Sequence, residues 1–523
     1  MAKTVRGHWP FVLVLAAGLA LRVLTEVAYR PALLYIDSAK YLVGSGGTAP
    51  EGYQVLLRLL DPLGGLGLVA AVQHAFGLAM AIAVYALLIR YRVPRWAAAL
   101  AAAPVLLDAY QLQLEQTVMP DVLFETMIVA GLVLLLWPQP PGQEPPGPER
   151  QRSLWPVAAG VLVLGATATV REIGAVLIVP AVVFAVVTTR SRRTGRAALA
   201  MACFALPVVG YMAAAYFVTG HFGLASNGPA PEYGRAATAA DCATLTLPAD
   251  ERPLCPSAGA ARALGGIDGL LHNPQSPGHT VPVPPGTTRA QLLAGFSLAV
   301  FRQQPLRVAA SVARDSVRLF ALTRDGDPEI TNIARWQFQA FYPTYPHRYT
   351  MADFTRLARQ HGSGGDLVAV KPAATILRDY QLGGGYTPGP LYAIGLVAGL
   401  LGSLSGLAVR RTPERRRKPA GRRALTAADR ELATACLLVP LSAVVLLLSS
   451  DAYEFSWRYQ LPAVVMVPVA GALGLTALAA QVGHRRERTS KAALTAAQSA
   501  TGGTGRRTRP ASATSGPQAP ADR

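Results

Sequence analysis

Long runs of apolar residues alternate with short polar or charged segments over most of the 523-residue chain. A bilayer core of roughly 30 Å needs about 20 apolar residues in helical form. The runs that approach or reach this length are Pro10–Ala28, Leu68–Ile89, Trp96–Leu114, Met119–Trp137, Trp155–Val170, Ala175–Val187, Ala197–Val218, Pro390–Val409, Glu431–Leu448 and Leu461–Val482. The pattern predicts an all-α polytopic membrane protein with about ten transmembrane helices and a mixed extracytoplasmic region.

Two features of the runs refine this prediction. Lys3 and Arg6 precede the first run, as in a signal sequence, but the many later spans favour an uncleaved first helix. Val170 and Ala175 flank a charged break, so the fifth and sixth helices are expected to be short or re-entrant.

Composition excludes an ordinary soluble enzyme. The chain is 51% hydrophobic and only 15% charged, whereas a soluble domain usually carries about 25% charged residues. The formal net charge is nevertheless +19, with 49 basic and 30 acidic residues. A surplus of this sign is typical either of nucleic-acid binding or of a membrane protein with a basic cytoplasmic side.

The positions of the basic residues favour the membrane protein. Clusters of arginine and lysine follow the second, sixth, eighth and tenth runs. They are Arg90, Arg92 and Arg95; Arg190, Arg192, Arg193 and Arg196; Arg410, Arg411, Arg415, Arg416, Arg417, Lys418, Arg422 and Arg423; and Arg485, Arg486, Arg488 and Lys491. With a cytoplasmic N-terminus every cluster falls on the cytoplasmic side, as the positive-inside rule requires. Nucleic-acid binding is therefore disfavoured, and both termini are expected in the cytoplasm.

This topology divides the chain into four parts. They are an N-terminal transmembrane module (1–218) with a first outer loop (29–67), a large extracytoplasmic loop region (219–387), the C-terminal transmembrane helices (388–483) and a basic cytoplasmic tail (484–523). The tail lacks hydrophobic periodicity and is expected to be disordered. Pro138–Arg152 reads as a proline-rich cytoplasmic linker.

Within the large outer region, Gln291–Leu322 has the pattern of an amphipathic helix, with apolar residues interleaved with arginines. Such a helix fits the membrane interface. It fits equally well as a packed helix of a small soluble subdomain, and the pattern alone leaves both interpretations open.

The four cysteines fall into two classes. Cys203 and Cys436 lie in apolar helices, whereas Cys242 and Cys255 lie together in the large outer loop. An oxidising exterior would allow the second pair to form a disulfide bond. A metal site there is disfavoured, since no further cysteine pair or nearby histidine completes four ligands.

Acidic residues beside membrane helices are costly and require an explanation. Asp37 follows the first helix, while Glu115 and Asp121 bracket the short outer turn between the third and fourth helices. Asp121 follows Pro120, so it also suits the first turn of a helix, where a carboxylate favours the helix dipole. Asp37 also fits a solvated loop acid.

Two arginines lie on the same face, where the charge rule disfavours them. Arg171 lies in the break between the fifth and sixth helices, beside Glu172, which would neutralise it in the simplest interpretation. Arg458 precedes the last helix among aromatic residues of an interfacial belt. An outward-facing cation next to the membrane is what a lipid phosphate needs.

Together these residues suggest one kind of chemistry. A carboxylate removes a proton from an acceptor hydroxyl, and cations stabilise the charge that develops on a departing lipid phosphate. This fits the transfer of a sugar from a lipid phosphate. No Walker-type or Rossmann glycine-rich loop is present.

With these residues and this topology, the chain resembles the GT-C superfamily of integral-membrane glycosyltransferases. This superfamily includes protein O-mannosyltransferases and bacterial transferases that use polyprenyl-phosphate sugars. The resemblance covers approximately residues 10–480, mostly as topology. Its motifs are Asp37-Ser38-Ala39-Lys40-Tyr41, Met119-Pro120-Asp121-Val122-Leu123, Thr169-Val170-Arg171-Glu172, Phe301-Arg302-Gln303-Gln304-Pro305-Leu306 and Arg458-Tyr459-Gln460-Leu461-Pro462.

The resemblance implies a role for each of these residues. Asp37 would be the catalytic base, and Glu115 and Asp121 would support the base or bind the acceptor. Arg171, Arg458 and Lys40 would bind the donor phosphate, and Tyr41 and Tyr459 would line the substrate cavity. Ser38 replaces the second acid of many relatives, which argues against a metal-bridging role. The resemblance implies no particular cofactor, and a divalent metal stays an open candidate.

The implied function is transfer of a sugar from a polyprenyl-phosphate donor to a protein, lipid or cell-wall glycan acceptor at the extracytoplasmic face of a bacterial plasma membrane. The bacterial source is suggested only by the Arg- and Ala-rich composition. Two alternatives stay open: a transporter or flippase of a lipid-linked glycan, and a non-catalytic transferase-like scaffold. Transporters often show inverted repeats and mid-helix charges. Here no convincing repeat is seen, and the notable charges lie at helix ends.

Overall fold

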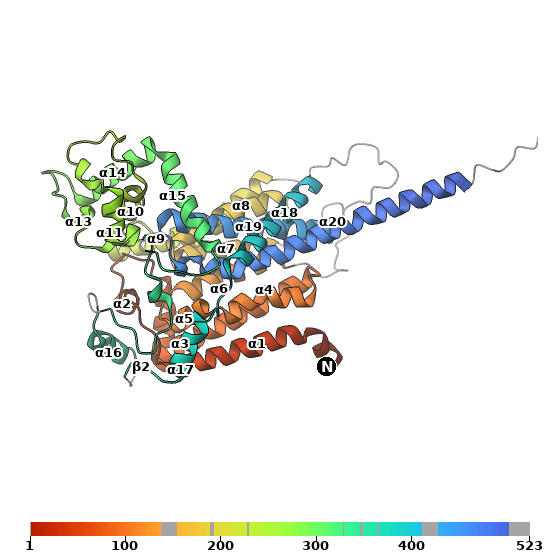
Figure 1. The fold of residues 1–523 in the computed structure, drawn as a ribbon, viewed down its shortest axis with the longest axis horizontal. Coiled ribbons are helices and arrows are strands. Elements are labelled where there is room, and N and C mark those ends of the chain that lie inside the picture. Colours follow the sequence, from red (N-terminus) through yellow and green to blue (C-terminus); the bar gives the residue numbers. More distant parts are fainter. Residues whose placement is uncertain are drawn as a thin grey trace, which may run out of the picture. The chain divides into compact units, whose positions relative to one another are not determined.

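A computed structural model describes residues 2–137, 154–188, 193–226, 228, 230–327, 329–345, 349–362, 366–410 and 427–501. Within these residues the regular structure is almost entirely helical (Figure 1), and the one sheet is an antiparallel pair of short strands, β1 (Tyr29–Arg30) and β2 (Val368–Ala369). The predicted all-α class is confirmed for this part of the chain. The proposed linker 138–152 and the basic cluster after Arg410 lie outside the described residues.

The N-terminal half contains most of the helices that pack in the apolar core. They are α1 (Ala2–Ala28), α2 (Ser38–Val43), α3 (Gly52–Arg90), α4 (Arg95–Leu107), α5 (Ala109–Gln116), α6 (Asp121–Leu136), α7 (Leu154–Ala166), the 3₁₀ helices η1 (Thr167–Thr169) and η2 (Glu172–Leu177), α8 (Ile178–Val187) and α9 (Arg193–Thr219). The 3₁₀ helices occupy the break that the sequence predicts between the fifth and sixth runs.

The outer region and the C-terminal half follow. They contain α10 (Ala230–Ala239), η3 (Arg252–Leu254), α11 (Ala258–Leu264), α12 (Gly266–His272), α13 (Pro277–Thr280), α14 (Arg289–Gln303), α15 (Pro305–Val317), η4 (Arg318–Phe320), η5 (Ile333–Trp336), α16 (Met351–Gln360), α17 (Ala373–Leu382), α18 (Gly389–Arg410), α19 (Ala427–Tyr453), η6 (Trp457–Gln460) and α20 (Leu461–Thr501).

Five of the described helices are long and apolar enough to cross a membrane, which does not confirm the expected ten. The five are Gly7–Ala28, Gly52–Arg90, Arg193–Thr219, Ala428–Tyr453 and Trp457–Gly483. Helices α4 and α5 qualify together as a sixth, but they are bent by 47° at Asp108. Three more apolar helices, Trp155–Thr169, Glu172–Val187 and Gly389–Leu404, are shorter. The third and fifth predicted runs therefore bend or shorten where polar residues interrupt them.

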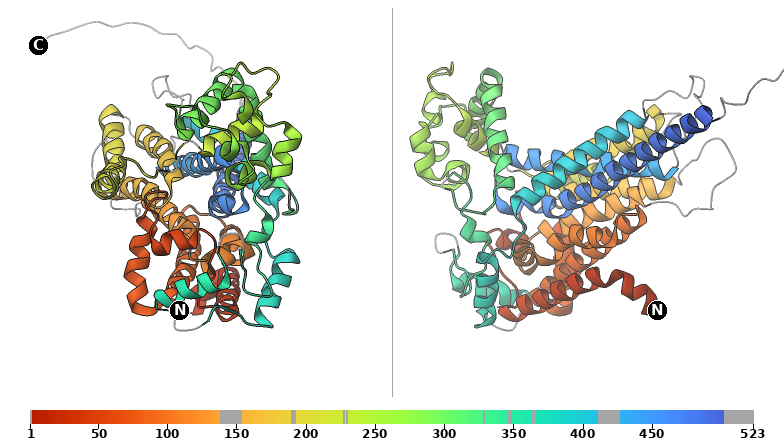
Figure 2. Two further views of the ribbon diagram at one scale, coloured as in Figure 1. Left: turned by 90° about the vertical axis from the view of Figure 1, so that its left-hand side faces the viewer. Right: turned by 45° about the vertical axis from the view of Figure 1, so that its right-hand side comes forward.

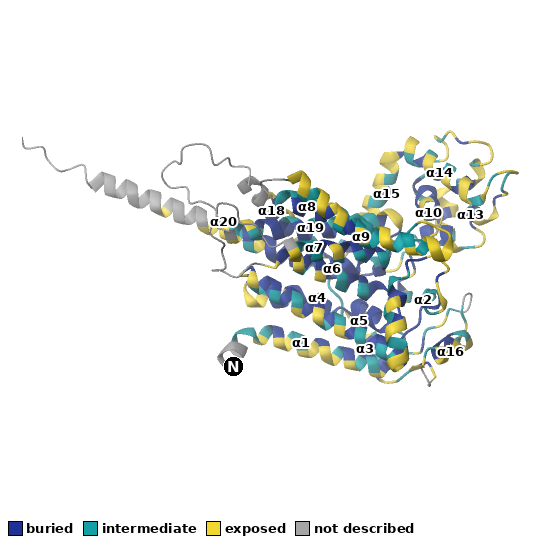
Figure 3. Cartoon of the chain, turned by 180° about the vertical axis from the view of Figure 1, so that it is seen from behind, coloured by how far each residue is buried: buried dark blue, intermediate teal, exposed yellow. Residues whose placement is uncertain are grey.

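Large apolar side chains are exposed on the outward faces of α1 and α9, while the interior between α3, α6, α7 and α19 is buried (Figure 3). Trp9, Leu13 and Val23 of α1 and Phe217 of α9 are more than half exposed. In water such surfaces are unfavourable, whereas hydrocarbon solvates them. The pattern is that of helices whose outer faces contact lipid.

Glycines bring neighbouring helices into close contact. A Cβ on Gly402 of α18 would lie 2.6 Å from Gly474 of α20, and one on Gly471 would lie 2.7 Å from Gly395. Small residues at such contacts allow the backbones of membrane helices to approach and gain dispersion energy. This packing holds the middle of the apolar part of α20 against α18.

Helix α3 is divided at Gly65, whose φ of 62° only glycine adopts at low cost. The part before it, Gly52–Gly64, belongs to the first outer loop of the predicted topology, and the part after it coincides with the second predicted span. Val55, Leu59 and Leu63 form an exposed apolar stripe at helical spacing on the first part. The first outer loop is thus itself largely helical.

The large outer region packs in two parts. Residues of α10 and α14, including Tyr233 and Phe296, form a separate small apolar core, visible as the group of short helices α10–α14 in Figures 1 and 2. Residues from Leu319 onward, including Trp336 and Phe354, belong instead to the main core with the membrane helices. Cys242 and Cys255 form a disulfide bond in the small core region, which is the pairing expected from their position.

The amphipathic segment Gln291–Leu322 is two helices rather than one, because Pro305 begins a new helix after Gln304. Helix α14 buries Leu292, Phe296 and Val300 in the small core, which is the packed-helix alternative. Helix α15 packs against α19 and α10. Arg235 of α10 anchors the small core by bonds to Asp315 (2.7 Å) and the carbonyl of Ala452 (3.2 Å).

The expected disordered tail is helical in its first part. Helix α20 continues to Thr501, past the predicted boundary at residue 484, and the predicted disorder of the tail stays a prediction. Residues such as Ala and Lys favour helix even without a packed face, which explains the extension. The described residues up to Ala477 form one compact unit, and those from Leu478 to Thr501 belong to another.

Candidate functional site

Asp37 lies at the start of a short turn, and the chain just before this turn is hydrogen-bonded to the segment before Asp121. The chain leaves α1 through β1, and Leu33 then pairs with the segment at Thr117 through Leu33 N to Gln116 O (2.9 Å) and Val118 N to Leu33 O (3.0 Å). Asp37 follows and is the N-cap residue of α2. The first outer loop and the turn before α6 are therefore held side by side.

Ser38, which replaces the second acid of many relatives, has a structural role. Its hydroxyl donates to the carbonyl of Val118 (2.9 Å) and accepts from the amide of Tyr35 (2.8 Å). Ser38 is fully buried. These bonds fix the turn at Asp37 against the segment that ends at Asp121.

Arg458 binds both of these acids. Its Nη1 donates to Oδ2 of Asp37 (3.0 Å), and its Nε donates to Oδ1 (3.0 Å) and Oδ2 (3.1 Å) of Asp121. Arg458 and Asp121 are buried, at 5% and 2% exposure, whereas the Asp37 side chain is 30% exposed. The guanidinium comes from η6, where the chain turns into α20, and Asp121 begins α6. Two carboxylates and one arginine from distant parts of the sequence thus form one site.

Two further cations join the site. Arg171, from the break between η1 and η2, forms an ion pair with Asp121 rather than relying on the adjacent Glu172. Lys40 lies 3.4 Å from Oδ1 of Asp37 and is about one-third exposed. The structure therefore brings together five of the predicted residues: Asp37, Lys40, Asp121, Arg171 and Arg458.

Aromatic rings surround the charges. The Tyr459 ring lies 4.9 Å from the guanidinium of Arg171 and 5.5 Å from that of Arg458. Trp336, which the sequence did not single out, lies 5.5 Å from Arg458. Tyr41 lies under Lys40 (5.3 Å) and packs edge-on against Tyr53. Rings over guanidinium groups stabilise the cations where water is excluded.

The site holds three cations and two carboxylates, so these five side chains carry a net charge of +1. Burial raises the pKa of Asp37, but Arg458 and Lys40 outweigh it and hold that pKa below its usual value. Asp37 is therefore ionised at neutral pH. Among the described residues, Nη2 of Arg458 and Nη2 of Arg171 have no hydrogen-bond partner, which leaves donors for an anion.

A small cavity adjoins Asp121 and Arg171. It is lined by Tyr459, by Ser450 of α19 and by Glu125, one turn after Asp121 on α6. Glu125 is 2% exposed. It was not predicted from the sequence, although an acid inside an apolar run is a signal that can be read there.

Glu115 does not belong to this site. It is fully buried and binds Arg22 Nη2 (2.7 Å) and His74 Nδ1 (2.8 Å), while His74 Nε2 contacts Gln116 (2.8 Å). The prediction that grouped Glu115 with Asp121 is corrected on this point, since the helical turn of α5 directs the Glu115 side chain toward α1 and α3. Arg22 and His74 were not predicted, although a charged residue within the first apolar run was a visible signal.

A second buried ion pair connects the outer region to the membrane helices. Arg324 donates to both oxygens of Asp108 (3.2 and 2.8 Å), and Asp108 also accepts from the amides of Tyr110 and Thr387. The rings of Tyr110, Tyr386 and Trp457 lie 4.4 to 5.2 Å from the Arg324 guanidinium. This pair fixes the bend between α4 and α5, and Trp457 links it to the neighbouring Arg458.

In the described part of the chain, no three His, Cys, Asp or Glu side chains converge in a way that could hold a metal ion. The chemistry that these residues provide on their own is that of an ionised carboxylate next to fixed cations. Such an arrangement suits deprotonation of a hydroxyl and stabilisation of a leaving phosphate.

Comparison with known protein families supports the resemblance. Residues 68–224 match the family of dolichyl-phosphate-mannose-protein mannosyltransferases, which belongs to the GT-C superfamily. No curated protein and no solved structure matches the chain. The matched segment contains Asp121 and Arg171 but neither Asp37 nor Arg458. The family match confirms the predicted class: a multi-pass membrane glycosyltransferase that uses a polyprenyl-phosphate sugar donor.

Proposed function

We propose that this membrane glycosyltransferase of the GT-C type moves a sugar from a polyprenyl-phosphate donor to an acceptor hydroxyl at the extracytoplasmic membrane surface, with Asp37 as general base. The single observation that carries the proposal is the joint binding of Asp37 and Asp121 by Arg458. Lys40 and Arg171 complete the cluster. The proposed orientation, with cytoplasmic termini, rests on the distribution of arginine along the chain. The proposed bacterial plasma membrane rests only on the Arg- and Ala-rich composition.

The proposed reaction assigns one step to each group. The acceptor O–H proton passes to the Asp37 carboxylate while the hydroxyl oxygen forms a bond to the anomeric carbon of the sugar. The bond between that carbon and the phosphate oxygen breaks, and its electron pair leaves with the polyprenyl phosphate. Asp37 suits the base because it is ionised and is the more exposed of the two carboxylates.

Cations stabilise the leaving phosphate in this mechanism. A sugar phosphodiester carries one negative charge, which balances the net charge of +1 on the five side chains. The charge on the phosphate increases as the bond to the sugar breaks, so fixed cations bind the transition state more strongly than the substrate. Arg171 and the free Nη2 of Arg458 are the proposed phosphate donors, and Lys40 is a third.

Asp121 has a positioning role in this proposal. It is buried and binds both Arg171 and Arg458, so it holds the two guanidinium groups in fixed positions. A cation that is already oriented costs little further entropy when the phosphate arrives. Tyr41 and Tyr459 flank the charges and are proposed to line the substrate cavity.

The name of the matched family suggests a first choice of substrates. It specifies a mannosyl donor on a lipid phosphate and a protein acceptor. We therefore propose a protein hydroxyl as the first acceptor to test and mannose as the first sugar. Lipid and cell-wall glycan hydroxyls are the next acceptors in the same assay.

The test is the substitution Asp37→Asn in the full-length protein. Loss of a general base lowers the rate by about 10²- to 10⁴-fold, and donor binding is expected to persist because the phosphate-binding cations stay in place. Asp366→Asn, at an exposed acid that pairs with Arg359, is the matched control and is expected to retain full activity.

Transfer at the wild-type rate by the Asp37→Asn variant would overturn the proposed mechanism. Movement of lipid-linked sugar across vesicles without a covalent product would identify a flippase instead. Absence of both transfer and movement by the wild-type protein, despite donor binding, would identify a non-catalytic scaffold.

A further inference from the structure

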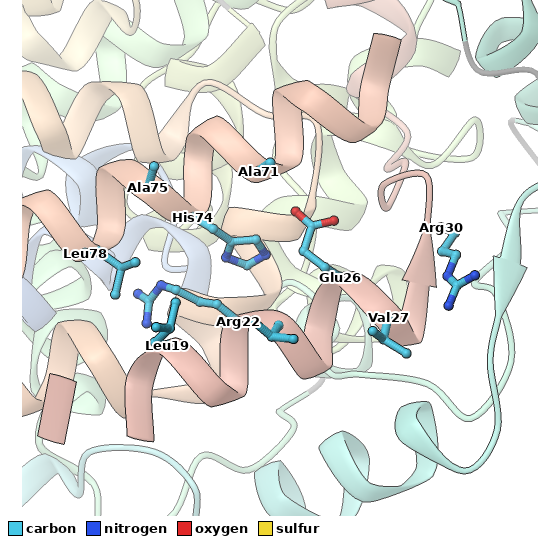
Figure 4. A pocket seen from close by; sticks show the side chains of 10 residues that line it. Leu19, Arg22, Glu26, Val27, Arg30, Ala71, His74, Ala75 and Leu78 are labelled. Carbon is cyan, nitrogen blue, oxygen red and sulfur yellow. The ribbon is translucent and has the colours of Figure 1, made fainter. Parts of the chain in front are cut away.

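A groove opens between α1 and α3, away from the charged site. Its volume is about 480 Å³, and Leu19, Val23, Val27, Ala71, Ala75 and Leu78 form its apolar walls. Arg22, Glu26, Arg30 and His74 supply its polar lining (Figure 4). Leu19 and Val23 are about half exposed, so the groove opens on the outward face of α1. That face is the one on which lipid contacts are expected.

Two opposite charges line this groove without binding each other. Glu26 Oε1 is buried and has no hydrogen-bond partner within the described residues. In the same part of the chain Arg30 is exposed and takes part in no ion pair. In Figure 4 the carboxylate of Glu26 turns toward the space beside His74, and Arg30 stands beyond the end of α1. The Glu26 carboxylate is hydrogen-bonded to Gln116 and lies near His74, so only its Oε1 lacks a donor among the described residues. A buried acceptor without a donor is costly next to an apolar phase.

A third polar atom in the groove is also unsatisfied. Nε of Arg22 is buried without a partner in the described part of the chain, although the Nη atoms of this side chain bind Glu115 and backbone carbonyls. Arg22 is 2% exposed. Two polar atoms beside the groove, Oε1 of Glu26 and Nε of Arg22, thus stay buried without a partner from the described residues.

The depth of these groups matches a lipid headgroup. The apolar span of α1 ends at Ala28, and a helix rises about 1.5 Å per residue. Glu26 consequently lies about 3 Å from the end of the span, Arg22 about 9 Å from it, and Arg30 just beyond it. The charges lie at the boundary between hydrocarbon and headgroups, and the apolar walls extend below them.

From this arrangement we infer that the groove binds a zwitterionic phospholipid with a primary ammonium group, of the phosphatidylethanolamine type. The ammonium group donates to the Glu26 carboxylate, and the phosphate accepts from the Arg30 guanidinium. An acyl chain lies along Leu19, Val23 and Leu78. A choline headgroup cannot donate a hydrogen bond to Glu26, and an anionic headgroup without an amine adds negative charge next to this carboxylate.

The polyprenyl-phosphate donor is a poorer match for this groove. It provides a phosphate for Arg30 but no cation for Glu26, which would be left next to added negative charge. The groove and the Asp37 cluster are separate, since no residue lines both. The inference therefore stands or fails independently of the proposed transfer reaction.

The experiment is native mass spectrometry of the delipidated full-length protein with phosphatidylethanolamine, phosphatidylcholine or phosphatidylglycerol of identical acyl chains, and with polyprenyl phosphate. We expect the ethanolamine lipid to bind about tenfold more tightly than the choline lipid, which is the size of one hydrogen bond to a charged group. Glu26→Gln is expected to abolish this preference. Arg30→Gln is expected to weaken phospholipid binding, whereas Arg58→Gln, at an exposed arginine outside the groove, is not.

Equal binding of the ethanolamine and choline lipids by the wild-type protein would overturn the inference. The same holds if Glu26→Gln retains the preference, or if polyprenyl phosphate competes with the ethanolamine lipid at equal concentration. Monodisperse elution and an unchanged melting temperature of each variant establish that it is folded, so that lost binding reports on the groove.

Discussion

Arg458 binds Asp37 and Asp121 simultaneously, through Nη1 to the first carboxylate and through Nε to the second. The two acids come from the first outer loop and from the start of α6, and the arginine comes from the start of the last helix. One planar guanidinium group thus determines the distance between the proposed base and its supporting acid. A side chain with a single ammonium group cannot reproduce this geometry.

Arg458→Lys is therefore expected to impair transfer although it preserves the charge. Lysine reaches one carboxylate at a time, so Asp37 loses its fixed position, and misplacement of this kind costs roughly 10²-fold in rate. Initial rates with saturating donor measure the effect. Arg58→Lys is the matched control. Wild-type turnover in Arg458→Lys would show that the bridge between the two acids is dispensable.

The pH dependence of transfer should respond to Lys40. Arg458 and Lys40 keep the pKa of Asp37 below its usual value, so the base stays ionised down to acidic pH and the rate falls only as pH drops through that lowered pKa. Lys40→Gln removes one cation and should move the acidic limb of kcat/KM to higher pH. Solvent screens the partly exposed lysine, so Arg458 continues to hold most of the lowering of the Asp37 pKa. An unchanged acidic limb of the kcat/KM profile would show that Lys40 does not influence the ionisation of Asp37.

Substitution of Glu115 is expected to lower stability, whereas substitution of Asp121 is expected to lower turnover. Glu115→Gln leaves the buried Arg22 without a charged partner, which costs about 3 to 5 kcal/mol of stability. We expect a lower melting temperature and yield, with near-normal turnover per folded molecule. Asp121→Asn is expected to reduce turnover, because both Arg171 and Arg458 lose their partner. Active-site titration alongside thermal melts distinguishes the two effects. A loss of turnover without a loss of stability in Glu115→Gln would show that Glu115 takes part in the reaction.

Hydrophobic periodicity was sufficient to predict the fold class and the positions of the long helices, since a single span encodes its own length and composition. Basic residues on the outer side of the membrane, where the positive-inside rule disfavours them, were equally informative. Arg171 and Arg458 were identified in this way before any contact was known, because both positions required an explanation. For this reason the sequence could predict five of the residues that gather at the site.

The partners of these residues could not be predicted in the same way. Glu115 lies only a few positions before Asp121, yet it faces α1 and α3, because the bend at Asp108 and the short helix α5 direct it there. Trp336 reaches Arg458 from the large outer region through long-range packing. Local patterns do not contain such contacts.

Glu454 provides a last prediction, on the pH dependence of stability. It is buried just after α19 and accepts a hydrogen bond from Thr331 of the outer region. Burial, together with nearby Asp268, raises its pKa from 4.5 to about 7. The folded protein therefore binds the Glu454 proton more tightly than the unfolded chain does. The stability that this proton contributes is lost as pH rises from 4.5 through 7.

Glu454→Gln mimics the protonated acid, so the melting temperature of this variant should decline less than that of the wild type across this range. Glu232→Gln, at the start of α10, is the control and should follow the wild type. Parallel declines in the wild type and Glu454→Gln would show that Glu454 does not titrate in the folded protein.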